Sequence, residues 1–162
     1  SSLCVILFYN FLSKIFIGDN GSYIIAVLLG IILIQFYNEN NSISSFYIVL
    51  LLWYPCFELL FSMLRKYRLK ISVIEPDNDH LHHLIFYFFM KKYNLNNLTA
   101  NNLTSLIILA FNFILFNIAS ANIYNSNKQC ALILSSIFIY IVLYYKFDYW
   151  KKNYSKKKNK SI

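Results

Sequence analysis

The sequence predicts an all-α protein, a polytopic bundle of helices embedded in a membrane. Its 162 residues are 58% hydrophobic and only 14% are charged, whereas a soluble domain carries about 25% charged residues. The mean hydropathy is +0.48. The apolar residues gather in long segments separated by polar loops, and so short a chain cannot bury that much apolar surface in water.

Five apolar segments follow one another along residues 1–150, which we treat as one membrane domain. The first, residues 3–17, gives about 22 Å of helix, which is short of the roughly 30 Å that a span requires. Because the chain starts at Ser1 within this segment, we expect a partial span and the C-terminal part of a longer protein. Complete spans are expected over residues 23–37, 45–64, 103–121 and 130–146.

A polar break is predicted between the first two segments. Gly18-Asp-Asn-Gly-Ser22 sets two glycines around polar residues, which is typical of a turn, and Ser22 can cap the next helix. Asp19 offers a hard oxygen ligand for magnesium, and backbone amides at a helix N-terminus can meet phosphate. Taken alone, this stretch is more simply interpreted as a turn that has no role in binding or catalysis.

The span over residues 45–64 carries two residues that are unusual at membrane depth. Pro55 removes a backbone donor and predicts a kink. Glu58 would cost about 2.5–3.5 kcal/mol in the bilayer centre, so its side chain should face protein or water. It either points into a central cavity or ties two helices together.

The one long hydrophilic stretch, residues 65–102, contains all three histidines of the chain. His80, His82 and His83 could bind a transition metal, donate hydrogen bonds to a diphosphate, or form a solvated turn. The apolar and aromatic piece that follows, residues 84–93, is too short to span, and we expect an interfacial helix there.

The basic residues are distributed as in a membrane protein. Six lie in the 65–102 loop and another six in the tail, residues 151–162, but none lies in the 38–44 loop. Positive residues concentrate on the cytoplasmic side, so the histidine loop, the C-terminus and Asp19 are expected to share the cytoplasmic face. The basic clusters flank apolar spans, which argues against nucleic acid as a partner. The tail itself is expected to be disordered.

Two motifs together resemble one family. Lys14-Ile-Phe-Ile-Gly-Asp-Asn-Gly-Ser22 and Pro76-Asp-Asn-Asp-His-Leu-His-His-Leu84 are similar, in order and spacing, to motifs in the C-terminal half of the polyprenyl-phosphate N-acetylhexosamine-1-phosphate transferases, bacterial glycosyltransferase family 4. The resemblance implies transfer of N-acetylhexosamine 1-phosphate from a UDP-sugar to undecaprenyl phosphate. It also implies that UMP is released and that the reaction initiates synthesis of a cell-surface polysaccharide at the bacterial inner membrane.

The resemblance also implies roles for single residues. Asp19 matches the aspartate that binds Mg²⁺, and Phe16 matches an aromatic residue that stacks on uracil. His80, His82 and His83 match the catalytic histidine motif near the diphosphate. Asn10 corresponds to an asparagine on the nucleotide side, and Asn20, Gly21 and Ser22 to the phosphate region.

An alternative follows from the same comparison. The family's paired aspartates lie in its N-terminal half, and no Asp-Asp pair occurs in this sequence. The chain would then be a truncated or split membrane subunit that does not catalyse without an N-terminal partner. The sequence leaves open which sugar is carried and whether a homodimer forms.

Overall fold

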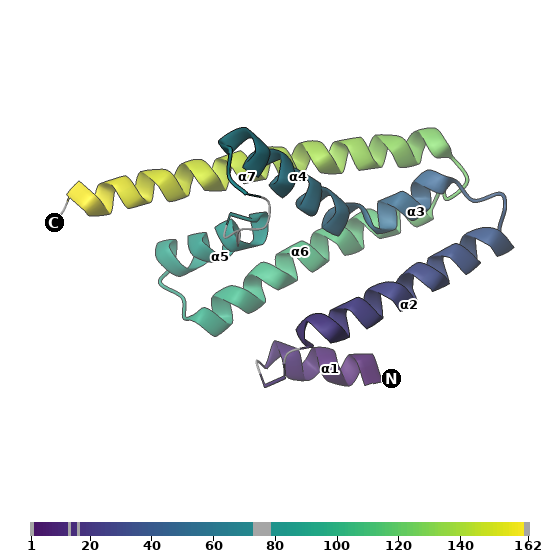
Figure 1. The fold of residues 1–162 in the computed structure, drawn as a ribbon, viewed down its shortest axis with the longest axis horizontal. Helices are drawn as coiled ribbons and strands as arrows, with labels where there is room; N and C mark the ends of the chain where they lie inside the picture. The colour runs from purple at the N-terminus through teal and green to yellow at the C-terminus, as the bar shows by residue number, and fades with distance from the viewer. Residues whose placement is uncertain (1, 13, 16, 73–78, 161–162) are drawn as a thin grey trace.

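The computed structural model describes residues 2–12, 14–15, 17–72 and 79–160, and within them it is built from α-helices alone. Figure 1 shows the arrangement. The helices are α1 (Ser2–Phe11), α2 (Gly18–Glu39), α3 (Ser45–Leu51), α4 (Trp53–Leu69), α5 (Leu81–Lys92), α6 (Asn97–Ser120) and α7 (Ser126–Lys160). The predicted all-α class is confirmed.

The two longest helices, α6 and α7, form the frame of the bundle (Figure 1). The short helix α5 packs against both of them, at the end of the bundle away from the α6–α7 connection. Helix α3 also contacts α6 and α7, while α2 runs along the outside. Helix α5 is therefore held on two sides by long helices, which fixes the position of its N-terminal histidines.

The core lies where α3, α4, α5, α6 and α7 meet. Its buried residues are Leu50, Trp53, Leu81, Leu84, Ile85, Leu115, Ala119, Tyr140 and Tyr144. Edge-to-face ring pairs add to the packing, with Phe61 and Tyr144 at 4.7 Å between ring centroids. Such pairs contribute about 0.5–1.5 kcal/mol beyond the area that they bury.

Polar contacts join the two loops at the opposite end. Ser44 caps α3 by accepting a hydrogen bond from the backbone N–H of Phe46, and its hydroxyl lies 2.9 Å from the Ser126 hydroxyl. Gln129 is fully buried, and its amide donates to the carbonyls of Ala119 and Asn122. These contacts fix the α6–α7 turn and seat α3 against it.

In the part of the chain that the structure describes, three helices are long and apolar enough to cross a membrane, over Asn20–Glu39, Asn97–Ser120 and Ser126–Lys156. They contain the expected spans 23–37 and 130–146 and all but the last residue of 103–121, and most of their side chains face outward. Exposed Leu, Ile and Phe side chains on all three helices are suited to contact lipid. The chain is thus a multi-pass membrane protein.

The fourth expected span, residues 45–64, is not one straight helix. It is divided at Leu52 into α3 and α4, which meet at 71° and are long and apolar enough to cross a membrane only as a pair. Pro55 explains the break because it lies in the first turn of α4, where a missing N–H is tolerated. In a continuous helix its ring would clash with the Leu51 carbonyl.

The predicted break at Gly18–Ser22 is wrong, because these residues form the first turns of α2. Gly18 has φ +67°, a conformation that favours glycine. The Ser22 hydroxyl donates to the Gly18 carbonyl at 3.0 Å within the helix, so it does not cap α2. The interruption lies earlier, since α1 ends at Phe11 and not at residue 17.

Two further expectations are corrected in the C-terminal half. Helix α5 buries Leu81, Leu84 and Ile85 in the core, so it is a packed part of the bundle and not only an interfacial helix. Helix α7 continues through the basic residues as far as Lys160, where a disordered tail was expected. The apolar face of α5 packs against both long helices. This packing stabilises a helix that would be too short to be stable on its own.

Candidate functional site

The candidate site lies at the N-terminus of α5, where the histidine cluster meets α4. His80 precedes the helix, and His82 and His83 lie in its first turn. The ring centroids of His82 and His83 are 4.3 Å apart, and the rings of His80 and His82 stack at 5.4 Å. The three imidazoles therefore form one compact group.

Glu58 of α4 connects this group to the rest of the bundle. Its Oε1 accepts a hydrogen bond of 3.0 Å from the backbone N–H of Leu81 and lies 3.1 Å from Nδ1 of His82. Nδ1 of His80 lies 3.8 Å from the same oxygen. The first N–H groups of a helix lack intrahelical partners, so a buried carboxylate from α4 here serves as a cap for α5.

Asp79 anchors the other side of the histidine loop. Its carboxylate lies 2.7 Å from Nζ of Lys151 and 3.1 Å from a guanidinium nitrogen of Arg65. The Arg65 guanidinium also lies over the Tyr144 ring at 5.9 Å. The segment just before α5 is thus tied to α4 and to α7.

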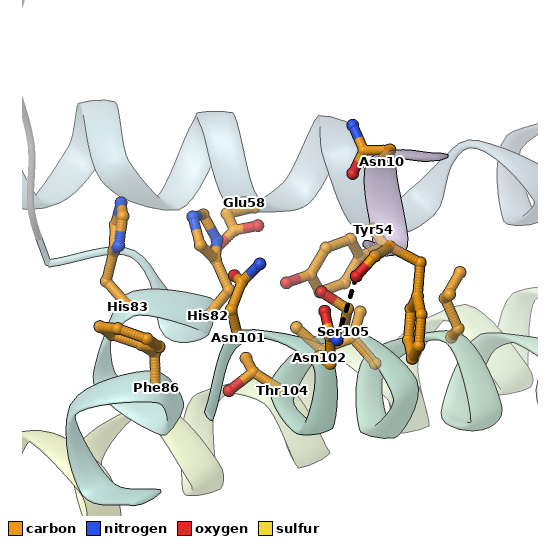
Figure 2. Close-up of a pocket in the computed structure, with 13 residues that line it drawn as sticks. Asn10, Tyr54, Glu58, His82, His83, Phe86, Asn101, Asn102, Thr104 and Ser105 are labelled. Carbon is orange, nitrogen blue, oxygen red and sulfur yellow. Dashed lines mark hydrogen bonds and ion pairs between the residues drawn. The ribbon is translucent and has the colours of Figure 1, made fainter. Parts of the chain in front are cut away.

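A pocket of about 720 Å³ opens beside the histidines. Figure 2 shows that its side chains come from α1, α4, α5 and α6. The residues that line it are Asn10, Phe11, Tyr54, Glu58, His82, His83, Phe86, Asn101, Asn102, Thr104, Ser105, Ile108 and Leu109. It combines amide, hydroxyl, imidazole and aromatic groups, and its volume is within the range of small-molecule sites.

One hydrogen bond closes the rim of the pocket on the α1 side. The Asn102 amide donates to the Phe11 carbonyl at 3.1 Å, as the dashed line in Figure 2 marks. This contact joins the first helix to the start of α6. It brings Asn10 to the same pocket as His82 and His83, although they are far apart in the sequence.

The remaining predicted site residues lie at the N-terminus of α2, just before α5, or outside the described residues. Phe16 lies outside the described residues, as does the side chain of Asp19, whose backbone lies in the first turn of α2. Asn20 and Ser22 belong to that same helix end, together with Gly21. His80 contacts Glu58 but is not among the residues that line the pocket.

The described side chains do not by themselves supply a metal centre. Within that part of the chain, no group of three or more His, Cys, Asp or Glu residues could hold a metal ion. Of the acidic residues in the histidine motif, Glu75 and Asp77 lie outside the described residues. Nδ1 of His80 and Nδ1 of His82 instead both face the Glu58 carboxylate.

The polar face of α6 was not identified from the sequence. Asn101 and Asn102 fall at the end of the predicted loop, and Thr104 and Ser105 fall at the start of a predicted span. Residues three and four apart share a helix face, so Asn101, Thr104 and Ser105 form one stripe once α6 begins at Asn97. The cluster of polar residues at the start of an apolar span is the sequence feature that could have indicated a polar face on this helix.

The fold and the pocket define a helical multi-pass membrane protein with a polar site at one end of the bundle. No protein-family model matches the chain, and no solved structure matches it. Two curated relatives do, and they agree with the resemblance seen in the motifs. The first is the probable undecaprenyl-phosphate N-acetylglucosaminyl 1-phosphate transferase of Bacillus subtilis, strain 168, which is 33% identical over 84 residues.

The second relative is the undecaprenyl-phosphate alpha-N-acetylglucosaminyl 1-phosphate transferase of Thermotoga maritima, which is 29% identical over 72 residues. The matched residues cover 51% and 44% of this chain, but only 24% and 23% of the relatives. The resemblance to this group of transferases is therefore confirmed for about half of the chain, over about a quarter of each relative.

Proposed function

We propose that the chain takes part in the transfer of N-acetylhexosamine 1-phosphate from a UDP-sugar to undecaprenyl phosphate, with release of UMP. The observation that supports this most is the meeting of Asn10, His82 and His83 at one pocket. These residues come from the two ends of the motif-bearing region. The names of both relatives supply the acceptor lipid and the class of reaction.

The chemistry of the pocket suits the nucleotide-sugar donor. The side chains of Asn10, Asn101 and Asn102 offer both donors and acceptors for a base and for an N-acetyl group. Phe11 and Phe86 offer aromatic surface beside them. Among the described lining residues there is no lysine or arginine, so a hydrogen bond from the His83 imidazole would meet the diphosphate, while His82 faces the same pocket.

The reaction is a phosphoryl transfer that needs positioning and charge stabilisation more than covalent help from the protein. An oxygen of the lipid phosphate attacks the phosphorus that carries the sugar. The bond from this phosphorus to the bridging oxygen breaks, and UMP leaves with the electron pair. An imidazole N–H placed near the diphosphate stabilises the charge that develops on the leaving phosphate.

Asp19 remains the proposed ligand of Mg²⁺, on the strength of the motif that it belongs to. Magnesium, when bound, would offset the negative charge of the two phosphorylated substrates. The chain would lie in the bacterial inner membrane, with the histidine site and the C-terminus in the cytoplasm. The concentration of basic residues in the 65–102 loop and after residue 150 supports that orientation.

The test is UMP release in membranes that contain the chain, supplied with UDP-N-acetylglucosamine and undecaprenyl phosphate. We expect activity that disappears on magnesium chelation and falls at least a hundredfold in His82→Asn and in Asp19→Asn. Asn117→Ala is the matched control, because Asn117 is an exposed amide on α6 outside the pocket. Wild-type rates in His82→Asn and Asp19→Asn would overturn the assignment.

A second arm of the same test separates the proposal from its alternative. The chain is coexpressed with the N-terminal part of a homologous transferase that includes the paired aspartates. Activity only in coexpression would support a split subunit and retain the pocket. No UMP release in either arm, with the chain inserted in the membrane, would contradict both.

A further inference from the structure

The Glu58 carboxylate holds the histidine cluster through a single oxygen. Oε1 accepts a hydrogen bond from the backbone N–H of Leu81 and lies 3.1 Å from Nδ1 of His82. Figure 2 shows the two side chains facing each other from α4 and α5. The Glu58 side chain is only 10% exposed, whereas that of His82 is 44% exposed toward the pocket and solvent.

This contact decides which ring nitrogen of His82 carries a proton. An ionised carboxylate can only accept hydrogen bonds, so Nδ1 must be the donor in the pair. In the neutral imidazole, Nε2 then has the free lone pair, because only one ring nitrogen is protonated. A carboxylate that orients a functional histidine through its second nitrogen is a recurrent arrangement in proteins.

The surrounding structure keeps the carboxylate in place. The amide of Leu81 fixes one oxygen, and Leu81 itself is buried in the core together with Leu84. Glu58 cannot move away without leaving that N–H unpaired in a buried site, which costs about 1–3 kcal/mol. The orientation of His82 is therefore set by the packing of α5 on α4, α6 and α7.

We propose that Glu58 is a positioning residue, which fixes His82 as its Nδ1–H tautomer and leaves Nε2 to accept a hydrogen bond from the ligand in the pocket. The inference rests on the proposed function for the identity of that ligand. It goes beyond a tether between two helices, because a tether alone does not require one tautomer of His82.

The first experiment needs no enzymatic activity. The full chain is labelled with nitrogen-15 histidine, placed in lipid nanodiscs and studied by NMR at pH 8, where an ordinary imidazole is neutral. With only three histidines in the chain, His82→Gln assigns the signal. We expect the Nδ1–H tautomer of His82 in the wild type. A dominant Nε2–H tautomer there would overturn the proposal, whether or not the chain is active.

The second experiment uses Glu58→Gln, which keeps the shape and an amide oxygen for the Leu81 N–H. We expect the preference of His82 for the Nδ1–H tautomer to weaken, because a neutral amide oxygen accepts a hydrogen bond less strongly than a carboxylate does. In the UMP-release assay we expect kcat to fall about tenfold to a hundredfold, with KM for the UDP-sugar changed less than threefold. An unchanged tautomer and kcat in Glu58→Gln would contradict the positioning role.

The two readouts separate this inference from the proposed function. If the tautomer shifts as expected in an inactive chain, the assignment of Glu58 stands and the transfer reaction fails. If Glu58→Gln does not insert or fold, Glu58→Asp is used, which keeps the charge and shortens the reach. We expect His82 in Glu58→Asp to keep part of its preference for the Nδ1–H tautomer, because the carboxylate charge is retained. If that variant lost the Nδ1–H tautomer completely and still had the wild-type kcat, the proposal would be contradicted.

Discussion

The indole Nε1 of Trp53 donates a hydrogen bond of 2.9 Å to Oδ1 of Asn112. Trp53 begins α4 directly after the break at Leu52, and Asn112 lies in the middle of α6. The Asn112 amide also donates to the Ile108 carbonyl of its own helix. This pair fixes where α4 starts on α6, and α4 in turn presents Glu58 to the histidines.

The Trp53–Asn112 bond should contribute measurably to stability. We expect Trp53→Phe and Asn112→Leu each to lower the free energy of unfolding. Their coupling in a double-mutant cycle should be about 0.6 kcal/mol, the average for such bonds between membrane helices. Reversible unfolding in bicelles measures it. Asn117→Ala is the control, since its exposed amide bonds only to Phe113 of its own helix, and a coupling of zero would contradict the role.

The left-handed conformation of Gly18 makes a second prediction. Gly18 has open space around its Cα but φ +67°, so Gly18→Ala should cost about 1–2 kcal/mol through backbone strain alone. Gly30 in the same helix has open space and no positive φ. Gly30→Ala should therefore be neutral or should stabilise by up to about 1 kcal/mol.

Thermal unfolding of the two glycine variants side by side provides the measurement. A loss of stability in Gly18→Ala together with no loss in Gly30→Ala is the expected pattern. If both variants behave alike, Gly18 does not adopt the left-handed conformation at the start of α2. The turn that the sequence predicts over residues 18–22 would then describe this segment better.

The pocket makes a third prediction, which rests on the proposed function. Ser105 lines the pocket from α6, so Ser105→Phe should fill part of its volume. We expect at least a tenfold rise in KM for the UDP-sugar, or in Kd when binding is measured by calorimetry. Ser135→Phe is the matched control, because Ser135 is exposed on α7 and outside the pocket lining. Unchanged donor affinity in Ser105→Phe would place the donor elsewhere.

Periodicity and composition were sufficient for the membrane-spanning helices and less reliable at their ends. Residues 23–37, 103–120 and 130–146 all lie in helices, because a run of apolar residues long enough to cross a bilayer has little alternative. The predicted span 103–121 extends only one residue past the end of α6. The break near Pro55 was predicted, but its location at Leu52 was not. It depends on where a proline is tolerated in the first turn of the following helix.

The sequence by itself determined the class of the protein, the positions of its three long spans and the two polar motifs that resemble the transferases. Only the tertiary structure decided that Glu58 caps α5 and contacts His82, that Asn10 reaches the histidine pocket, and that α6 supplies a polar stripe to it. Hydropathy and motif spacing are local properties of the chain. Contacts between residues far apart depend instead on how five helices pack around one core, and no single segment carries that information.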